Sequence, residues 1–174
     1  MHELIRASAY REQVWKNGGG LTREIAAADS WRLSIATIQR DGPFSEYRGF
    51  DRTIVAIEGD QVELEVNGTR IALAPFEPFE FAGEDSVYAR VLGKARDLNV
   101  MSARDAFAHD LAIVHGRERF ILDEDETTFV IAIDGDVNVG DTMLHAGDTL
   151  ALEGVDALVV TAHGRAAVVR LTEL

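Results

Sequence analysis

Short runs of alternating apolar and polar residues recur along the chain, and this alternation predicts strands. The segment Trp31–Ile38 (WRLSIATI) is the clearest example, because every second side chain of an extended chain points to the same side. Trp31 begins an apolar face, whereas Arg32, Ser34 and Ala36 share the opposite face. The segment therefore predicts a strand whose two faces meet different surroundings.

Runs of this kind follow one another about every 8–12 residues, with turn residues between them. One of these turns, Asn67-Gly68, is a strong signal for a β-hairpin. Many short strands joined by regular turns are typical of an all-β sandwich or barrel. The best helix candidates are Glu3–Lys16 and Ala103–Val114. The predicted strands are Trp31–Ile38, Arg52–Ile57, Gln61–Val66, Ile71–Leu73, Val87–Leu92, Phe129–Ile133, Thr149–Leu152, Ala157–Thr161 and Ala166–Leu171.

The chain also contains an internal repeat. The octapeptide Thr53–Asp60 (TIVAIEGD) matches Phe129–Asp136 (FVIAIDGD), which lies 76 residues further along. Glycines that stay in register after such a match indicate two copies of one β unit. After the octapeptide the spacing becomes 71 residues, and the pairs in register are Phe81 with Leu152, Gly83 with Gly154 and Gly93 with Gly164.

The repeated unit resembles the cupin barrel, and the pair of units resembles a bicupin. Gly59 and Gly135 match the glycine that follows a strand in the first cupin motif, and Gly147 matches the x-Gly-Asp turn of the second motif. The resemblance implies an all-β, bicupin-like fold with two β-barrel or jelly-roll units related by the repeat. We expect residues 1–105 to form the first cupin-like barrel, which bears the ligand site. Residues 106–174 should form a second, degenerate barrel, packed with the first as one compact unit.

Many cupins hold a metal through a His-x-His pair, a Glu and a distant His, but the corresponding positions here carry other residues. Counting back from Gly59 places Arg52 where the Glu ligand would lie, and Ser45 and Tyr47 near the positions of the two His. An arginine cannot bind a metal, because its guanidinium is a permanent cation that only donates hydrogen bonds. The five His residues form no HxH or HxxxH pair. We therefore predict no metal and no other cofactor.

Composition excludes several classes of function. The chain has 17 Lys and Arg against 30 Asp and Glu, a formal net charge of −13, which argues against nucleic acid or an anionic membrane as a partner. It has no Cys, so a disulfide, a thiolate nucleophile and a Cys-based zinc site are excluded. The start of the chain has no apolar signal segment, and no run approaches the roughly 18 apolar residues of a membrane helix. We therefore expect a cytoplasmic protein.

Two segments carry residues that a β scaffold does not require. The first runs from Trp15 to Gly20 (WKNGGG), where three glycines would let the backbone approach a ligand and offer N–H groups as an anion-binding nest. The alternative for this segment is a flexible loop. The second is the face of Arg32, Ser34 and Ala36, which either lines the interior of a barrel or faces solvent.

Two further segments are equally unusual. Asp41–Ser45 (DGPFS) begins with turn residues and is followed by Gly49–Arg52 (GFDR). Arg52 could point inward as a carboxylate-binding fork or form a solvated ion pair. Asp97 and Asn99 share one face of a strand, which suits either a pocket wall or a strand edge. The second copy of the repeat has plainer residues at these positions, which indicates one binding half and one supporting half.

Together these segments are similar to the HutD/Ves family. The family pattern runs approximately W-x-N-G-G-G-x-T-x-E-I, W-R-x-S-x-A, D-G-P-F-S, G-x-D-R and D-x-N-x-M, and this chain has all of these blocks in order. They are Trp15–Ile25 (WKNGGGLTREI), Trp31–Ala36 (WRLSIA), Asp41–Ser45 (DGPFS), Gly49–Arg52 (GFDR) and Asp97–Met101 (DLNVM). The blocks cover residues 15–101, so the second half resembles the family only through the repeat.

The resemblance implies a bicupin-like protein without the usual metal ligands, often encoded with genes of histidine utilisation. The implied function is non-catalytic binding of a small carboxylate metabolite, such as N-formylglutamate, which would modulate histidine breakdown. The Ves branch is instead associated with environmental stress. The expected partner is thus a small anionic metabolite, and a homodimer is one state that the chain could adopt.

We expect the ligand site in the first barrel and predict no catalytic residue. Cationic side chains would neutralise carboxylates, neutral polar side chains would supply hydrogen bonds, and aromatic side chains would wall the pocket. The candidate ligand-binding residues are Trp15, Lys16, Asn17, Gly18, Gly19, Gly20, Arg32, Ser34, Phe44, Ser45, Arg52, Asp97 and Asn99.

Two other functions stay open at this point. The protein could be a metal-free, cupin-type enzyme acting on a small acid, with Glu24, Asp51 or Asp97 as its general base. Lys16 or Arg52 would then stabilise an oxyanion. It could instead be a structural or interaction protein whose barrel only dimerises. An apolar barrel interior without a pocket would favour that last function.

Overall fold

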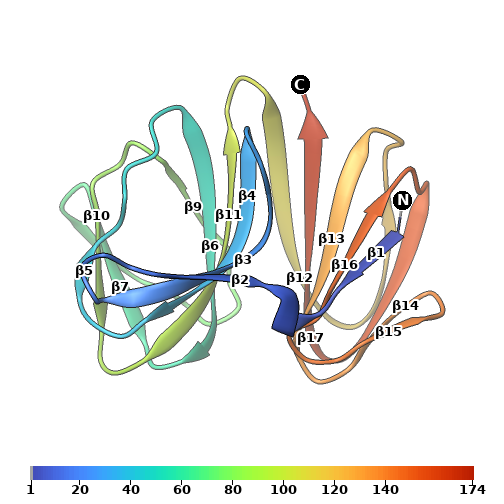
Figure 1. Ribbon diagram of the computed structural model, residues 1–174, viewed down its shortest axis with the longest axis horizontal. Helices are drawn as coiled ribbons and strands as arrows, with labels where there is room; N and C mark the ends of the chain where they lie inside the picture. Colours follow the sequence, from blue (N-terminus) through green and yellow to red (C-terminus); the bar gives the residue numbers. More distant parts are fainter. Residues whose placement is uncertain (1) are drawn as a thin grey trace. The chain divides into compact units, whose positions relative to one another are not determined.

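The computed structural model describes residues 2–174 and consists mainly of strands (Figure 1). Within these residues the only regular element that is not a strand is the short 3-10 helix η1 (Ala7–Ala9), so the all-β prediction is confirmed. Contacts between residues divide the chain into two compact units. The first unit is Arg11–Ala106, and the second unit combines the residues up to Tyr10 with Phe107–Leu174.

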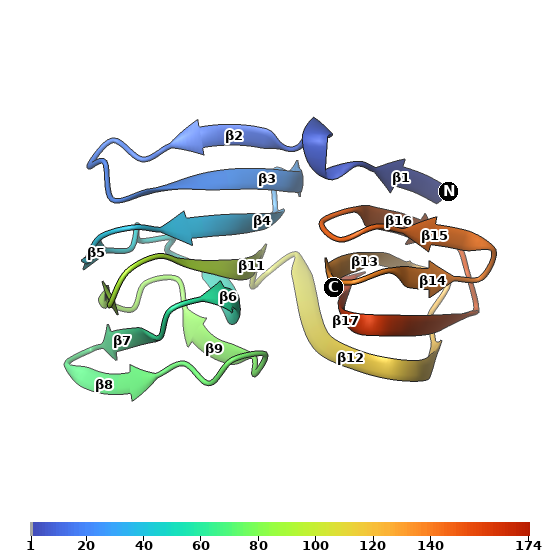
Figure 2. The ribbon, with the colours of Figure 1, turned by 90° about the horizontal axis from the view of Figure 1, so that it is seen from below.

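The first unit is built from two sheets. One sheet has six strands in the order β2-β3-β4-β11-β6-β9, and the other has four strands in the order β5-β10-β7-β8. Figure 2 shows β2, β3, β4 and β11 side by side, with β6 next to β11. The strands are β2 (Arg11–Val14), β3 (Gly20–Ala28), β4 (Trp31–Ile38), β5 (Gly42–Pro43), β6 (Phe50–Gly59), β7 (Val62–Val66), β8 (Thr69–Ala72), β9 (Phe79–Ala82), β10 (Val87–Val91) and β11 (Ala95–Ala103).

Apolar side chains from both sheets form the core of the first unit. Burial of such side chains is the main favourable term in folding, and it fixes which face of each strand points inward. Trp15 and Phe44 are partly buried and pack against this core, so the core reaches two of the candidate site residues. The buried members are Ile38, Ile54, Val62, Leu64, Leu73, Phe81, Val87, Ala89 and Ala95.

The second unit contains one seven-stranded sheet. Six of its strands follow the order β1-β16-β13-β17-β14-β15, and the seventh, β12, pairs with β17. The pairing of the two long strands β12 and β17 shifts register once, between His115 and Gly116. The strands are β1 (His2–Ile5), β12 (Phe107–Ile121), β13 (Glu126–Asp134), β14 (Val137–Val139), β15 (Thr142–Leu144), β16 (Thr149–Glu153) and β17 (Ala157–Glu173).

Apolar side chains also fill the interior of the second unit. Many of them are completely buried, and none of the candidate ligand-binding residues lies among them. This composition agrees with the plainer residues that the second copy carries in the sequence. The buried cluster contains Val114, Leu122, Val130, Ala132, Val137, Val139, Leu144, Leu150, Leu152, Leu158, Val160, Ala162, Ala166 and Val168.

The start of the chain lies with the second unit, although we expected it in the first barrel. Strand β1 pairs with β16, with Glu3 opposite Ala151. The Arg6 guanidinium lies 2.6 Å from the Asp148 carboxylate, and Asp148 also accepts the Ala7 N–H. Ladder hydrogen bonds and this ion pair therefore attach residues 2–10 to the second unit. The later boundary between the two units follows Ala106.

Both helix predictions are wrong. The segment Glu3–Lys16 contains β1, η1 and β2, and the segment Ala103–Val114 contains a turn followed by the start of β12. In each segment the backbone groups find partners in a neighbouring strand, β16 or β3 for the first segment and β17 for the second. Sheet pairing thus overrides a weak helix propensity.

The internal repeat reappears as a pair of equivalent corners. In the first unit β6 ends at Gly59, and the next N–H, that of Asp60, donates to the Lys94 carbonyl at 2.9 Å. In the second unit the His163 N–H donates to the Asp136 carbonyl at 3.0 Å. Gly59 has a φ of +95°, and a Cβ there would lie 2.2 Å from the Lys94 carbonyl oxygen. The close approach of two backbones explains why the repeat retains a glycine at this position.

Candidate functional site

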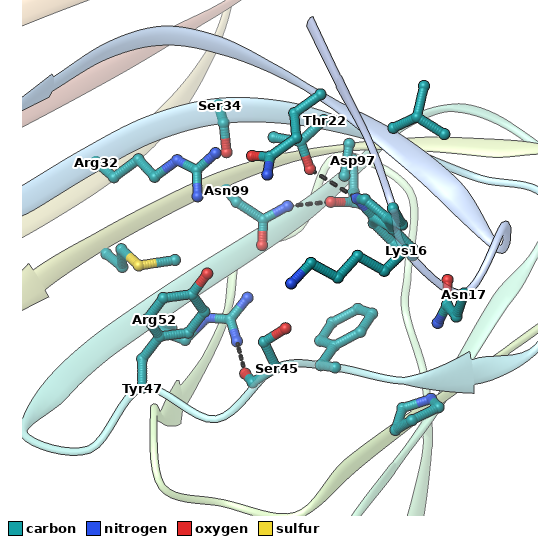
Figure 3. Close-up of a pocket in the computed structure, with 17 residues that line it drawn as sticks. Lys16, Asn17, Thr22, Arg32, Ser34, Ser45, Tyr47, Arg52, Asp97 and Asn99 are labelled. Atoms are coloured by element: carbon teal, nitrogen blue, oxygen red, sulfur yellow. Dashed lines mark hydrogen bonds between the residues drawn. The ribbon is translucent and has the colours of Figure 1, made fainter.

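The first unit contains a cavity of about 420 Å³ (Figure 3). Each of the five sequence blocks that resemble the HutD/Ves pattern contributes residues to its lining. Its walls come from β2, β3, β4, β5, β6 and β11 and from the segments that follow β2 and β5. The lining residues are Gln13, Val14, Trp15, Lys16, Asn17, Thr22, Arg32, Ser34, Ala36, Pro43, Phe44, Ser45, Tyr47, Arg52, Asp97, Asn99 and Met101.

Strands β4, β6 and β11 form the floor of the cavity, because they are neighbours in one sheet. Asn99 lies opposite Ser34 of β4, and Met101 lies opposite both Arg32 of β4 and Arg52 of β6. Side chains at alternate positions of a strand share a face, so each strand presents its polar residues to the same side. Of the two alternatives for the face that carries Arg32 and Ser34, the structure shows the interior one.

Arg52 is the central cation of this site. The residue is 8% exposed, and its guanidinium carbon lies 4.8 Å from the ring centroid of Phe81, 5.4 Å from that of Tyr47 and 5.5 Å from that of Phe44. Aromatic faces attract a cation through their quadrupole, more strongly where water is excluded. Three rings thus hold the guanidinium in place without neutralising it.

No carboxylate in the described part of the chain lies within ion-pair distance of Arg52, although other arginines have such partners. One terminal nitrogen donates to the Ser45 carbonyl at 3.2 Å, while Nε is buried and has no hydrogen-bond partner. Burial lowers the pKa of the Arg52 guanidinium, an effect that the nearby Tyr47 and Asp97 oppose. Arg52 is therefore a buried cation whose hydrogen-bonding capacity is largely unused.

Arg32 and Lys16 are the other cations of the cavity. Arg32 is already paired, because its Nε lies 3.0 Å from a carboxylate oxygen of Glu24. Lys16 follows β2 at an exposed position, and Figure 3 shows its side chain extending across the cavity. Arg52 and Lys16 are thus better placed than Arg32 to meet a ligand's negative charge.

Asp97 and Asn99 form a buried pair on β11. Asp97 has no exposed surface, and one of its oxygens accepts a hydrogen bond from the Asn99 side-chain amide. The other oxygen, Oδ2, is buried without a partner. Burial raises the pKa of Asp97 to about 7, although the bond from Asn99 and the charge of Arg52 favour the ionised form. The carboxyl group therefore titrates near neutral pH.

The glycine motif has a structural role that the sequence did not indicate. Gly18, Gly19 and Gly20 do not line the cavity. The Gly18 N–H donates to the Trp15 carbonyl, and the Gly19 N–H donates to the side-chain oxygen of Asn17. These amides are already bonded within the turn, so the predicted anion-binding nest is not formed by them.

The tight turn instead positions Trp15. The Trp15 ring lies against Gly20, where a Cβ would be 3.1 Å from the ring and 2.2 Å from the Thr37 carbonyl oxygen. The indole N–H donates to the Thr22 hydroxyl at 2.8 Å. The absence of a side chain at Gly20 therefore allows the aromatic wall of the cavity to pack directly on the backbone.

The structure brings ten of the thirteen candidate residues together around one cavity, and the three glycines are the exceptions. Sequence reasoning missed Gln13 and Val14, because it placed them in an expected helix. It also missed Phe81 of β9, whose ring centroid lies 4.8 Å from the Arg52 guanidinium carbon. No local signal in the sequence links that phenylalanine to Arg52.

The three carboxylates considered as general bases lie in different surroundings. Asp97 lines the cavity, whereas Glu24 is paired with Arg32 and does not line it. Asp51 is exposed and lies 2.8 Å from Arg104. Among residues 2–174, no group of three or more His, Asp or Glu side chains is arranged to hold a metal ion. No helix within the same residues is long and apolar enough to cross a membrane.

The arrangement defines a class of protein: a cupin-like β protein whose first unit holds a polar, cationic cavity. A cupin barrel protein from Leptotrichia buccalis has a similar fold, with 8% identity, a TM-score of 0.63 and coverage of 94% of this chain and 96% of its own. A bacterial pirin from Escherichia coli is also similar, with 12% identity, a TM-score of 0.72 and coverage of 100% and 99%. These neighbours confirm the cupin-like fold.

The chain belongs to the HutD family, whose sequence pattern matches residues 7–170. A protein of Pseudomonas putida, described as an uncharacterized 21.2 kDa protein in the hutC 3' region, is 36% identical over 90% of both chains. Protein Ves of Citrobacter koseri is 38% identical over 76% of this chain and 73% of its own. The solved structure of HutD from Pseudomonas fluorescens is 33% identical, with a TM-score of 0.93 and full coverage of both chains. The resemblance inferred from the motifs is thereby confirmed.

Proposed function

We propose that this protein binds a small carboxylate metabolite, such as N-formylglutamate, in the cavity of the first unit, without a metal and without chemical conversion. The cavity of about 420 Å³ has room for a molecule of that size. Binding would serve as a signal that modulates histidine utilisation in the cytoplasm. The P. putida relative, described by its place in the hutC 3' region, supports this direction.

The observation that carries the proposal is the unpaired state of Arg52. A buried charge is costly unless an opposite charge or several hydrogen bonds compensate for it. Arg52 is 8% exposed, has no carboxylate partner in the described residues and keeps Nε unbonded. A ligand carboxylate would supply the missing charge and accept from the guanidinium in a charge-assisted bond. Lys16 would meet a second carboxylate across the cavity (Figure 3).

Isothermal titration calorimetry with N-formylglutamate, glutamate and urocanate tests this proposal. The wild type should give saturable heat with at least one of them. Arg52→Ala should weaken that binding by about 2–5 kcal/mol, roughly thirtyfold or more. Arg48→Ala is the matched control, because Arg48 is exposed and lies outside the cavity in the segment just before Arg52. No saturable heat with any of the three compounds would refute the proposal.

A second candidate function is a metal-free enzyme, and the titration of Asp97 favours it. A general base works best when its pKa is close to the working pH, and burial raises the pKa of Asp97 to about 7. Incubating the protein with the compound that binds and following its NMR spectrum separates the two functions. Turnover that Asp97→Asn abolishes would establish catalysis, and an unchanged spectrum would favour pure binding. A protein that only dimerises is less favoured, because the first unit holds a polar cavity.

A further inference from the structure

Asn99 presents one defined end of its side-chain amide to the cavity. It lies on β11 next to Ser34 of β4 and is 7% exposed. Its Nδ2 donates to the Asp97 carboxylate, which lies two residues earlier on the same face of the strand. Figure 3 shows this bond and the opposite end of the amide, Oδ1, turned away from Asp97.

The chemistry of Asp97 fixes this orientation. An ionised carboxylate only accepts hydrogen bonds, so it binds the NH₂ end of an amide and turns the carbonyl end away. Asn99 would otherwise be free to present either end, since the two differ little in shape. Asp97 is fully buried on β11, which pairs with β4 and β6 on either side, so the choice is built into the protein.

Within residues 2–174, no group donates a hydrogen bond to the Asn99 side-chain carbonyl, and the side chain's one bond is the donation to Asp97. Arg52 and Lys16 border the same cavity and carry the positive charges that a carboxylate needs. The cavity therefore combines cations for an acid group with one fixed acceptor for a donor group.

We propose that Asp97 is a positioning residue, which holds Asn99 as a specificity-determining hydrogen-bond acceptor. The site then selects a small carboxylate that also carries an N–H group. An N-acylated amino acid has this chemistry. The inference rests on the proposed function and deepens it, because it states which carboxylates the cavity prefers. A ligand without the N–H group would leave the Asn99 carbonyl buried and unbonded, which is costly.

The test compares two probes that differ in one atom. N-acetylglutamate has an amide N–H, and O-acetyl-2-hydroxyglutarate has an ester oxygen in its place, with the same charges and nearly the same shape. Calorimetric titration at pH 8, where the Asp97 carboxyl is ionised, should show the wild type binding the amide at least about tenfold more tightly. Asn99→Leu removes the acceptor and should bring the ratio of the two dissociation constants close to one.

Asp97→Asn separates positioning from structural support. The substitution keeps the shape of the side chain, but an amide both donates and accepts and so holds Asn99 in either orientation. The ratio between the probes should therefore fall, although the variant stays folded. Asn138→Leu, in the second unit, is the control and should keep the wild-type ratio.

If both probes bind the wild type equally, the inference is wrong and the proposed function stands. If Asp97→Asn keeps the full wild-type ratio, Asp97 does not position Asn99. If neither probe binds the wild type, the proposed binding of such carboxylates fails, and the specificity inferred here fails with it.

Discussion

Arg52 shows how a single residue can favour function over stability. Its guanidinium is buried among three aromatic rings, which attract it but do not supply the negative charge that a buried cation normally has. The site is thus electrostatically incomplete in the absence of a ligand.

We predict that Arg52→Met abolishes ligand binding without lowering stability. Methionine has a similar volume, packs well against aromatic rings and removes the cost of burying an unpaired charge. The free energy of unfolding should be equal to or greater than that of the wild type in the absence of ligand. Urea denaturation followed by tryptophan fluorescence measures it for the first unit, which contains both Trp15 and Trp31. A loss of more than about 1 kcal/mol would contradict the prediction, because it would mean that Arg52 stabilises the empty protein.

The titration of Asp97 predicts a pH-dependent stability. Its pKa is about 7 in the folded protein against an ordinary value of 3.8 for an exposed aspartate, so between these pH values the proton is bound mainly by the folded protein. Stability should therefore fall as the pH rises through this window and level off above pH 7. From pH 5 to pH 8 the loss should be roughly 2–3 kcal/mol, as two pKa units indicate.

Asp97→Asn should remove this dependence, because an amide does not titrate. The free energy of unfolding of the variant minus that of the wild type should therefore increase from pH 5 to pH 8. The increase should be about the amount that the wild type loses, and urea denaturation at the two pH values measures it. Asp51→Asn is the control, since Asp51 is exposed and should not produce this gain. Equal pH profiles for the wild type and Asp97→Asn would mean that Asp97 is not the titrating group.

At the scale of elements, the sequence predicted the strands that are buried along most of their length. Strand β4 was predicted with its exact bounds, and the predicted segment Arg52–Ile57 lies within β6. Most residues of both strands are buried, and the sequence indicates this through alternation in β4 and through a β-branched apolar run in β6. Strand β2 is exposed along its whole length, so burial imposes no pattern on it, and the prediction failed there. Pairing with β3 defines β2, and such pairing is not visible in local sequence.

The candidate site was predictable to the extent that its residues are unusual for a strand. Polar residues such as Ser34 and Asn99 are uncommon on the inner face of a sheet and so indicate a cavity. The sequence did not indicate that β4, β6 and β11 are neighbours, which is what brings these residues together. It also could not distinguish glycines that bind a ligand from glycines that allow close packing.

We predict that Gly20→Ala disturbs the packing of β3 against β4. Its Cβ would lie 2.2 Å from the Thr37 carbonyl oxygen and 3.1 Å from the Trp15 ring, so both must shift. Overpacking of this kind typically costs about 1–3 kcal/mol. Urea denaturation should show this loss, and the emission of Trp15 should change. Gly42→Ala is the matched control, because its Cβ would meet only the Asn17 side chain at 3.7 Å, and a similar loss there would contradict the packing argument.

At the scale of the whole molecule, the two copies of the repeat have diverged in their interiors. The first unit combines an apolar core with a polar cavity, whereas the second unit is filled by apolar side chains. Both retain the glycine corner that joins paired strands, so the fold is conserved between the copies and the cavity is not. This difference supports the interpretation from the sequence that one half binds and the other half supports the fold.

The net charge of −13 should influence how fast an anion reaches the cavity. At 10 mM ionic strength electrostatic forces extend about 30 Å, so an approaching dianion is repelled by the charge of the whole molecule. At 150 mM they extend about 8 Å, and the ligand then responds mainly to the cations beside it, Arg52 and Lys16. The association rate constant should therefore rise with salt, the reverse of attraction between opposite charges.

Stopped-flow measurements of Trp15 fluorescence with N-formylglutamate at 10, 50 and 150 mM salt would check this expectation. We expect the association rate constant to increase several-fold over this range, because screening removes the long-range repulsion before it weakens the contact with Arg52. Repeating the series with sodium chloride and with sodium gluconate separates screening from competition by chloride. A rate constant that falls steadily with both salts would contradict the expectation. It would mean that the cavity cations attract the ligand at long range, although the chain has 30 acidic and only 17 basic residues.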